Sequence, residues 1–400
     1  MELQQIAALA ILLVVVVLSA TPWVHRAAVA LAGAVLLAAA GLSVGLIPDV
    51  LLTAAGLMIL SGYLKRSGLA SWMALKAAKL GRGRPGPILI LTALLSYLVS
   101  ALLGPMAAVA LVVPVVLLLA SELDTPPLPF VVVLSWAALL GGATTLTSQA
   151  GNLWLGYMLD VDGAEWLFRL LPYTASAMAA TLLTALVVFR RQLRVTNERR
   201  ARVLEYDEAQ SLSDRILLVK TICVLALVVV GLVLGPWLGV STAVVVVGGA
   251  ALLWLLDSPR SNILGDLDGL TLLYFASFML VAGAVVTSGL PSLTASVFPS
   301  HPLGILGITG LLGAFVDHGA VAGVTASFLQ ASGLRELWPF VILGTSLGAG
   351  TTIWGALSTG AALGLAGHGP RKTTWQEYTK YSLVFAAVNF VVLSGLALLN

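Results

Sequence analysis

Two stretches of the sequence, 221 positions apart, carry the same pattern: Gly62-Tyr-Leu-Lys-Arg-Ser-Gly68-Leu69 and Gly283-Ala-Val-Val-Thr-Ser-Gly289-Leu290. Two further pairs follow in the same order. Ser100-Ala-Leu-Leu-Gly104-Pro105 aligns with Gly313-Ala-Phe-Val-Asp317-His318 at an offset of 213, and Gly141-Gly-Ala-Thr144-Thr145 aligns with Gly348-Ala-Gly-Thr351-Thr352 at an offset of 207. Three short matches in one order, with slowly drifting offsets, indicate an internal repeat. In an apolar chain, repeats with Gly- and Pro-broken segments at corresponding places are typical of secondary transporters.

The composition predicts an all-α integral membrane protein. Of the 400 residues, 59% are apolar and only 10% are charged, and the mean hydropathy is +1.01. Many windows are long enough to span a bilayer as helices. The net charge is +3. The positively charged residues lie in a few short stretches, which favours a positive-inside pattern over a nucleic-acid surface. We therefore expect a multi-pass protein of the plasma (inner) membrane with no nucleic-acid partner.

Ten apolar segments are expected to span the membrane, at about 5–20, 27–47, 49–64, 130–158, 171–189, 216–234, 240–256, 270–287, 338–364 and 381–399. The loops 65–84 and 190–215 are rich in Lys and Arg. Basic loops favour the cytoplasmic side, so both loops are expected there. Counting spans outward from them places the N- and C-termini outside.

Two further segments, about 86–120 and 303–331, are interrupted by Gly104-Pro105 and by Asp317-His318-Gly319. A half of about 15 residues rises only about 22 Å as a helix, less than a hydrocarbon core of about 30 Å. Two clear spans lie between segment 86–120 and the cytoplasmic loop 190–215. Segment 86–120 must therefore begin and end on the cytoplasmic side, as a re-entrant hairpin does. The same count gives a second hairpin at 303–331 that enters from outside.

Each half thus has five spans and one hairpin, and because five is odd the halves are inverted relative to each other. The first repeat is expected to cover residues 1–189 and the second residues 216–400, joined by a cytoplasmic linker at 190–215. In each half one long span, 130–158 or 338–364, has a middle rich in Gly and Thr. Such a composition weakens a helix, so we expect each of these spans to be broken there.

A broken span within a membrane must line a cavity or be enclosed in protein. Its free carbonyl and hydroxyl oxygens suit a small cation such as Na⁺, and its exposed helix N-termini suit an anion. The candidate substrate-binding residues are Gly104, Thr144, Thr145, Asn152, Asp317, His318, Thr351 and Thr352. The candidate cation-coupling residues are Thr147, Ser148, Asp317, Ser358 and Thr359.

Asp317 is the one acid expected deep in an apolar segment, where an ionisable group is costly and marks function. The neighbouring His318 could carry a proton near neutral pH. The first hairpin tip has no polar side chain, so Gly104 would contribute backbone groups. Small and hydroxyl residues also serve close helix packing, which is the alternative interpretation. The recurrence of the cluster in both halves favours a binding site.

We expect a secondary active transporter of a small anion, coupled to Na⁺ or H⁺. The alternative is a cation/proton antiporter in which Na⁺ and H⁺ compete for Asp317. An enzyme is not expected, because the sequence has no zinc-type His/Glu spacing, no nucleophile–base pair and no nucleotide-binding loop. No cofactor other than a possible Na⁺ is expected, and no nucleotide.

The chain resembles the ion transporter superfamily, which includes divalent anion/sodium symporters, citrate carriers, arsenite pumps of the ArsB type and sodium/proton antiporters of the NhaD type. The resemblance covers nearly the whole chain. It rests on the order of a Leu-Lys-Arg-Ser-Gly68 turn, a Gly-Arg-Gly-Arg-Pro85 loop, a hairpin and a Gly-rich broken span. Residues 141–153 resemble the symporters, whereas residues 348–359 most resemble the arsenite pumps and antiporters.

The resemblance implies a citrate-transporter-like domain, a homodimer, elevator-like motion of a transport domain, and contacts to Na⁺ and substrate at the hairpin tips and broken spans. It leaves an arsenite-type efflux permease as a further alternative. The chain departs from the dicarboxylate symporters, which carry a Ser-Asn-Thr motif at each hairpin tip. Here the tips read Leu103-Gly104-Pro105 and Asp317-His318-Gly319.

Overall fold

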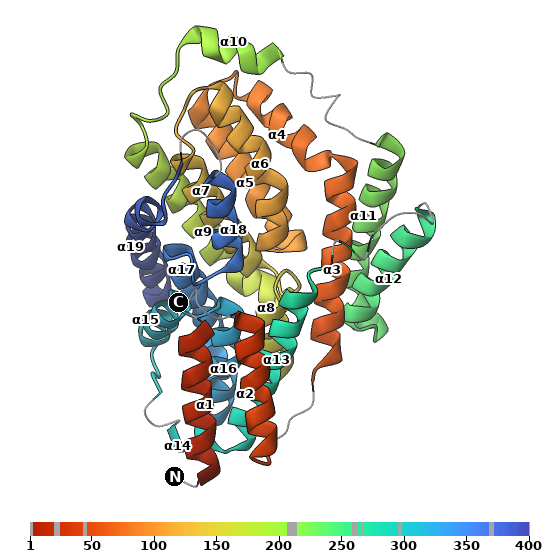
Figure 1. Ribbon diagram of the computed structural model, residues 1–400, viewed down its shortest axis with the longest axis vertical. Coiled ribbons are helices and arrows are strands. Elements are labelled where there is room, and N and C mark those ends of the chain that lie inside the picture. The colour runs from red at the N-terminus through yellow and green to blue at the C-terminus, as the bar shows by residue number, and fades with distance from the viewer. Residues whose placement is uncertain are drawn as a thin grey trace.

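The computed structural model describes residues 3–19, 25–42, 46–205, 214–257, 263, 265, 267–294, 298–367 and 372–399. Throughout these residues the regular structure is helical (Figure 1). The all-α fold that the sequence predicts is therefore confirmed. Residues 206–213 of the predicted linker lie outside the described residues, as do the chain ends Met1, Glu2 and Asn400.

The first half is built from α1 (Leu3–Ser19), α2 (Arg26–Ala39), α3 (Pro48–Ser67), α4 (Leu69–Leu80), α5 (Pro85–Leu103), α6 (Pro105–Glu122), α7 (Leu128–Thr144), α8 (Ala150–Leu159) and α9 (Gly163–Val188). The linker contributes α10 (Asn197–Glu205). Proline in the first turn starts α3, α5, α6 and α7. At that position the missing N–H costs nothing and the fixed φ suits a helix.

The second half contains α11 (Arg215–Leu238), α12 (Thr242–Leu256), α13 (Gly269–Thr287), α14 (Leu290–Thr294), α15 (Pro302–Gly313), α16 (His318–Ser332), a 3₁₀ turn η3 (Arg335–Leu337), α17 (Trp338–Thr351), α18 (Leu357–Ala366) and α19 (Trp375–Leu399). The two halves interlock. Helix α2 packs on α13 and α12 on α3, while α8 packs on α16 and α18 on α6.

The first hairpin is longer than the sequence predicts. Helices α5 and α6 have 19 and 18 residues, so each rises about 27 Å, and the expected half of about 15 residues is wrong here. Helices α15 and α16 of the second hairpin have 12 and 15 residues. Among the described residues, six helices are long and apolar enough to cross a membrane, and α5 and α6 are two of them. Length alone therefore does not make the first hairpin re-entrant.

Contacts at the bases of the hairpins bear on the same question. The guanidinium of Arg199 in α10 lies 2.5 Å from the carboxylate of Asp124, which follows α6. At the second hairpin, Arg335 donates a 2.5 Å hydrogen bond to the carbonyl of Asp160, between α8 and α9. Glu336 pairs with Arg169 of α9 at 2.6 Å. If both hairpins are re-entrant, the base of the first must lie beside the linker and the base of the second beside the connection between α8 and α9, and these contacts fulfil that requirement. The side of the membrane on which each base lies stays a prediction.

The same hydrogen bonds recur in the two halves at the offsets of the sequence repeat. Thr145 Oγ1 donates to the Ala101 carbonyl, and Thr352 Oγ1 donates to the Ala314 carbonyl. The side chain of Asn152 donates to the Gly142 carbonyl, and that of Thr359 donates to the Ala349 carbonyl. Each pair joins corresponding positions of a hairpin or a broken span. These matched contacts support the predicted repeat.

The two long spans are broken, but later than the glycines suggest. The breaks cover residues 145–149 and 352–356, five residues in each half. Gly141 and Gly348 remain helical. A Cβ atom on Gly141 would lie 2.1 Å from the Tyr97 carbonyl oxygen, and one on Gly348 would lie 2.1 Å from the Gly310 carbonyl oxygen. These two glycines therefore serve close helix packing, which was the alternative to a binding role. They let α5 pack closely on α7 and α15 on α17.

Candidate functional site

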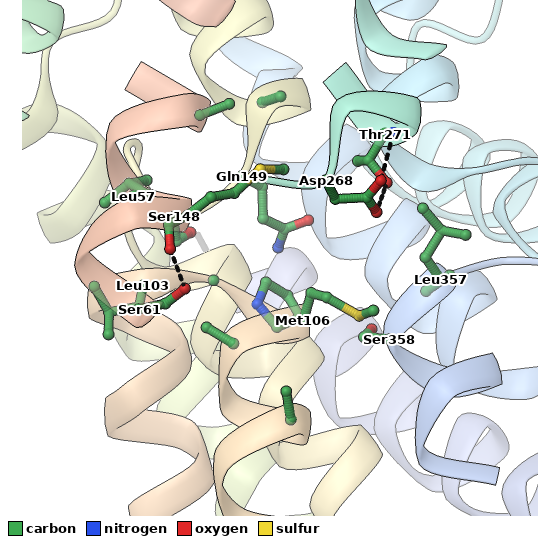
Figure 2. A pocket seen from close by; sticks show the side chains of 18 of the residues that line it. Leu57, Ser61, Leu103, Met106, Ser148, Gln149, Asp268, Thr271, Leu357 and Ser358 are labelled. Atoms are coloured by element: carbon green, nitrogen blue, oxygen red, sulfur yellow. Dashed lines mark hydrogen bonds between the residues drawn. The ribbon is translucent and has the colours of Figure 1, made fainter. Parts of the chain in front are cut away.

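A cavity of about 350 Å³ lies where both hairpin tips and both breaks meet α3 and the start of α13 (Figure 2). A volume of this size is at the lower end of the range for small-molecule sites. Its walls combine apolar side chains with a few polar groups. Lys65 and Asp268 are exposed, whereas Ser148, Asp317 and Ser358 are buried.

Half of the predicted site residues line this cavity: Gly104, Thr147, Ser148, Asp317, His318 and Ser358. Gly104 joins α5 to α6 with φ of +93°, which favours glycine over residues with a side chain. A Cβ atom there would lie 2.4 Å from the Ser148 carbonyl oxygen. The first hairpin tip therefore touches the first break through backbone alone. The second tip meets the second break through the His318 N–H, which donates to the Gly355 carbonyl at 3.3 Å.

The other predicted residues lie next to the cavity but do not line it: Thr144, Thr145, Asn152, Thr351, Thr352 and Thr359. Their side chains bond to the backbone around the breaks. Asn152 donates to the carbonyls of Gly142 and Thr145, at 2.9 Å each. Such bonds satisfy carbonyl groups that the end of α7 leaves without helical partners. In this structure the side chains of these residues stabilise the backbone conformation of the breaks.

Five helices begin at the cavity wall: α6, α8, α13, α16 and α18. Asp268 caps α13 and Asp317 caps α16. The residues that precede α6, α8 and α18 are Gly104, Gln149 and Ala356, and none of them makes a side-chain cap. Uncapped helix starts present free amide N–H groups and partial positive charge. The cavity therefore offers three such starts to a ligand.

Gln149 and His318 bring unpaired polar atoms to the cavity. Both amide atoms of Gln149 and both ring nitrogens of His318 are buried and have no hydrogen-bond partner among the described residues. The Gln149 side chain is only 7% exposed, and Figure 2 shows its amide pointing into the cavity. Buried polar groups are nearly always paired. A ligand with polar atoms would supply the missing partners.

Asp317 stands between the second hairpin helices at the cavity wall. It is 5% exposed, and its Oδ1 accepts the Gly319 N–H at 3.0 Å. The same cavity is lined by the hydroxyl groups of Ser148 in the first break and of Ser358 in the first turn of α18. Carboxylate, hydroxyl and carbonyl oxygens are hard ligands for a small cation.

Sequence reasoning missed several polar residues of the wall: Ser61, Lys65, Gln149, Asp268 and Thr271. Gln149 lies within the Gly- and Thr-rich cluster, but its position one residue before α8 is known only from the structure. Asp268 precedes an apolar segment, where an acid is usually only a helix cap. It does cap α13, and Figure 2 shows its bonds to Thr271.

Comparison with known proteins gives a consistent result. Residues 11–360 match the family described as citrate transporter. An uncharacterized transporter of Mycobacterium tuberculosis is 28% identical over 361 residues, covering 86% of this chain and 84% of that protein. An uncharacterized transporter of Synechocystis is 23% identical over 375 residues, covering 84% and 82%. The solved structure of the YdaH transporter of Alcanivorax borkumensis, described as having an unusual topology, superposes with a TM-score of 0.57 at 17% identity. That superposition covers 88% of this chain and 84% of YdaH.

Proposed function

We propose, because the chain belongs to the citrate transporter family, that it is a secondary active transporter of a small anion coupled to Na⁺ or H⁺. The family and the similar proteins named above are membrane transporters. The predictions that the chain is a multi-pass transporter and not an enzyme are thereby confirmed. The anion and the coupling ion are the subject of the proposal.

The single observation that supports an anionic substrate is the set of uncapped helix starts around the cavity, one of which follows Gln149. Helices α6, α8 and α18 begin at one cavity without a side-chain cap. Free N–H groups at helix starts bind anions. The buried Gln149 amide adds an unpaired donor, and Lys65 adds positive charge to the wall. An anion there would satisfy donors that the protein leaves open.

Asp317 supplies the negative charge that a coupling cation needs. Na⁺ would take oxygen ligands from Asp317 and from hydroxyl or carbonyl groups of the cavity wall, which include the side chains of Thr147, Ser148 and Ser358. H⁺ would instead bind the carboxylate or His318. In either case the cation offsets the charge of the anion, so that the two move together.

The remaining parts of the proposal concern motion and assembly. We place the two halves as inverted repeats, each with five spans, a hairpin and a broken span, in the plasma membrane with both termini outside. The matched hydrogen bonds and the interlocked halves support this arrangement. Elevator-type alternating access and a homodimer follow from the resemblance to the ion transporter superfamily.

A cation/proton antiporter is the second candidate. The observation that favours it is the charge of the wall, where Asp268 and Asp317 outnumber the single cation Lys65 among the described residues. In this case Na⁺ and H⁺ would compete for Asp317. An arsenite-type permease remains a variant of the first proposal, since a hydroxylated solute would use the same donors.

A flux experiment separates the two candidates. Everted vesicles containing the protein and a pH-sensitive dye are given a Na⁺ gradient, with and without a panel of small anions. A symporter moves no net protons with Na⁺ alone, and anion uptake depends on the gradient. Proton flux driven by Na⁺ in the absence of any anion, lost in Asp317→Asn, would instead establish the antiporter.

A further inference from the structure

The protein holds a second, nearly closed hollow of about 10 Å³ between α8, α13 and α16. Ten residues line it, most of them apolar. By volume it holds no ligand. Its position is informative because of the repeat.

At the offsets of 221, 213 and 207, eight of these ten residues correspond to residues that line the large cavity. Phe278 corresponds to Leu57, Met279 to Met58, and Ala320 to Ala107, for example. Trp154 corresponds to Ala361, which lines a shallow hollow next to the large cavity, beside Lys65. The small hollow is therefore the repeat-related copy of the large cavity.

The two copies differ in how far they are open. Met279 and Ala320 are 4% and 2% exposed, whereas their counterparts Met58 and Ala107 are half-buried. Aromatic side chains of α13, such as Phe278, fill the closed copy. The same structural unit thus appears once open and once shut.

Close packing shuts the second copy, because a Cβ atom on Gly319 of α16 would lie 3.3 Å from the ring of Phe275 in α13. A Cβ atom on Gly151 would lie 2.3 Å from the Cα atom of Gly319, so α8 and α16 touch directly. The indole of Trp154 covers Gly323, where a Cβ atom would lie 2.1 Å from the ring. At the open copy the positions equivalent to Gly151 and Gly319 are Ser358 and Met106, and both line the cavity.

We propose that the small hollow is the closed second mouth of the cavity. The route to the opposite side of the membrane runs between α13 and the pair α8–α16, and it opens when α3 closes on the pair α6–α18. This inference rests on the proposed transporter function. It adds the location of the second route and the residues that seal it, with Phe278, Met279 and Trp154 as the seal.

Single cysteines at repeat-related positions test the proposal. The background is Cys223→Ser, which removes the one native cysteine. Ala107→Cys reports the open mouth and Ala320→Cys the closed one. A membrane-impermeant maleimide is applied to everted and to right-side-out vesicles. We expect fast labelling of Ala107→Cys from the cytoplasmic face, and slow labelling of Ala320→Cys from the other face only.

The expected difference follows from the population of the minor state. Two conformations a few kcal/mol apart leave the minor one populated at roughly 0.1–10%, so labelling of Ala320→Cys should be roughly 10- to 1000-fold slower. A bulky side chain placed as a wedge in the open mouth, by Ala107→Trp or Met58→Trp, should slow the labelling of Ala320→Cys further. The wedge prevents α3 from closing on the pair α6–α18. A wedge that unfolded the protein would speed labelling, which is the opposite direction.

Leu118→Trp is the matched control, because Leu118 is on the same helix as Ala107, is 48% exposed and lines none of the cavities described above. It should leave the labelling rate of Ala320→Cys unchanged. The proposal is overturned if Ala320→Cys stays unlabelled from the outer face in vesicles where Ala107→Cys reacts. Labelling from the cytoplasmic face, or rates that both wedges leave unchanged, would also overturn it. No cargo is used, so this result is independent of the flux experiment.

Discussion

Two glycine substitutions should destabilise the protein where the same change elsewhere in its helices should not. Gly141→Ala and Gly348→Ala each place a methyl group 2.1 Å from a backbone carbonyl oxygen, that of Tyr97 or of Gly310. Because the obstacle is backbone, no side chain can rotate away. The matched controls are Gly248→Ala and Gly395→Ala, which lie inside α12 and α19 and have no atom within 4 Å of the added Cβ.

The expected magnitude is a balance of two effects. Alanine in a helix interior is favoured over glycine by up to about 1 kcal/mol. An ordinary contact needs about 3.4 Å, so α5 or α15 must move away by roughly 1.3 Å, and overpacking of this kind costs roughly 1–3 kcal/mol. Since the backbone must shift, the upper end applies. The net effect is about 2–3 kcal/mol of destabilisation at positions 141 and 348, and up to about 1 kcal/mol of stabilisation at the controls.

Thermal unfolding of the purified protein in detergent measures the difference. A change of 1 kcal/mol moves Tm by roughly 2 °C in a large domain, so the two pairs should shift in opposite directions. Similar losses at positions 141 and 348 would reflect the equivalent packing of the two hairpins. If either variant is as stable as its control, the close approach of hairpin and broken helix is not present in that half.

Four further substitutions separate binding from folding. Asp317→Asn should abolish coupled transport but leave Tm within a few degrees, since Asn caps a helix about as well as Asp and keeps the acceptor for the Gly319 N–H; wild-type rates at every pH would remove the carboxylate from the mechanism. Gln149→Leu should leave stability unchanged or higher, because no hydrogen bond is lost, while anion-dependent flux falls; a clear loss of Tm would show that the amide has a structural partner. Asn152→Ala removes two hydrogen bonds to backbone carbonyls and Thr359→Val removes the one to the Ala349 carbonyl. At about 1 kcal/mol for each bond, Asn152→Ala should lower Tm about twice as far, and equal shifts would contradict that accounting.

The sequence predicts which segments are interrupted, because Gly104-Pro105 and the Gly- and Thr-rich clusters weaken a helix wherever they occur. It does not predict where the breaks begin. The helix α7 continues through Gly141 because that glycine packs on Tyr97, and it ends after Thr144, where Asn152 and Thr145 bond to the backbone. These contacts join residues far apart in the chain, and hydropathy carries no information on them.

The candidate site shows the same division. The repeat predicted that Ser148, Asp317 and Ser358 would belong to one site, because hairpins and broken spans recur in one order, and all three line one cavity. Gln149 and Asp268 could not be chosen in advance. Whether a polar residue at the start of a helix is solvated, capped or unpaired depends on the tertiary packing around it, and of these two residues Gln149 is unpaired whereas Asp268 caps α13.

The most direct test of the account is ligand-induced stabilisation of the purified protein. Sulfate, phosphate, citrate and succinate are added with and without Na⁺, at neutral and at acidic pH, and Tm is measured. A ligand at 100 times its Kd stabilises the folded state by about 2.7 kcal/mol. The account predicts that at least one anion raises Tm, that Na⁺ or acidic pH strengthens the effect, and that Gln149→Leu and Asp317→Asn each remove it. A protein stabilised by Na⁺ alone through Asp317, with no response to any of these anions, would contradict it.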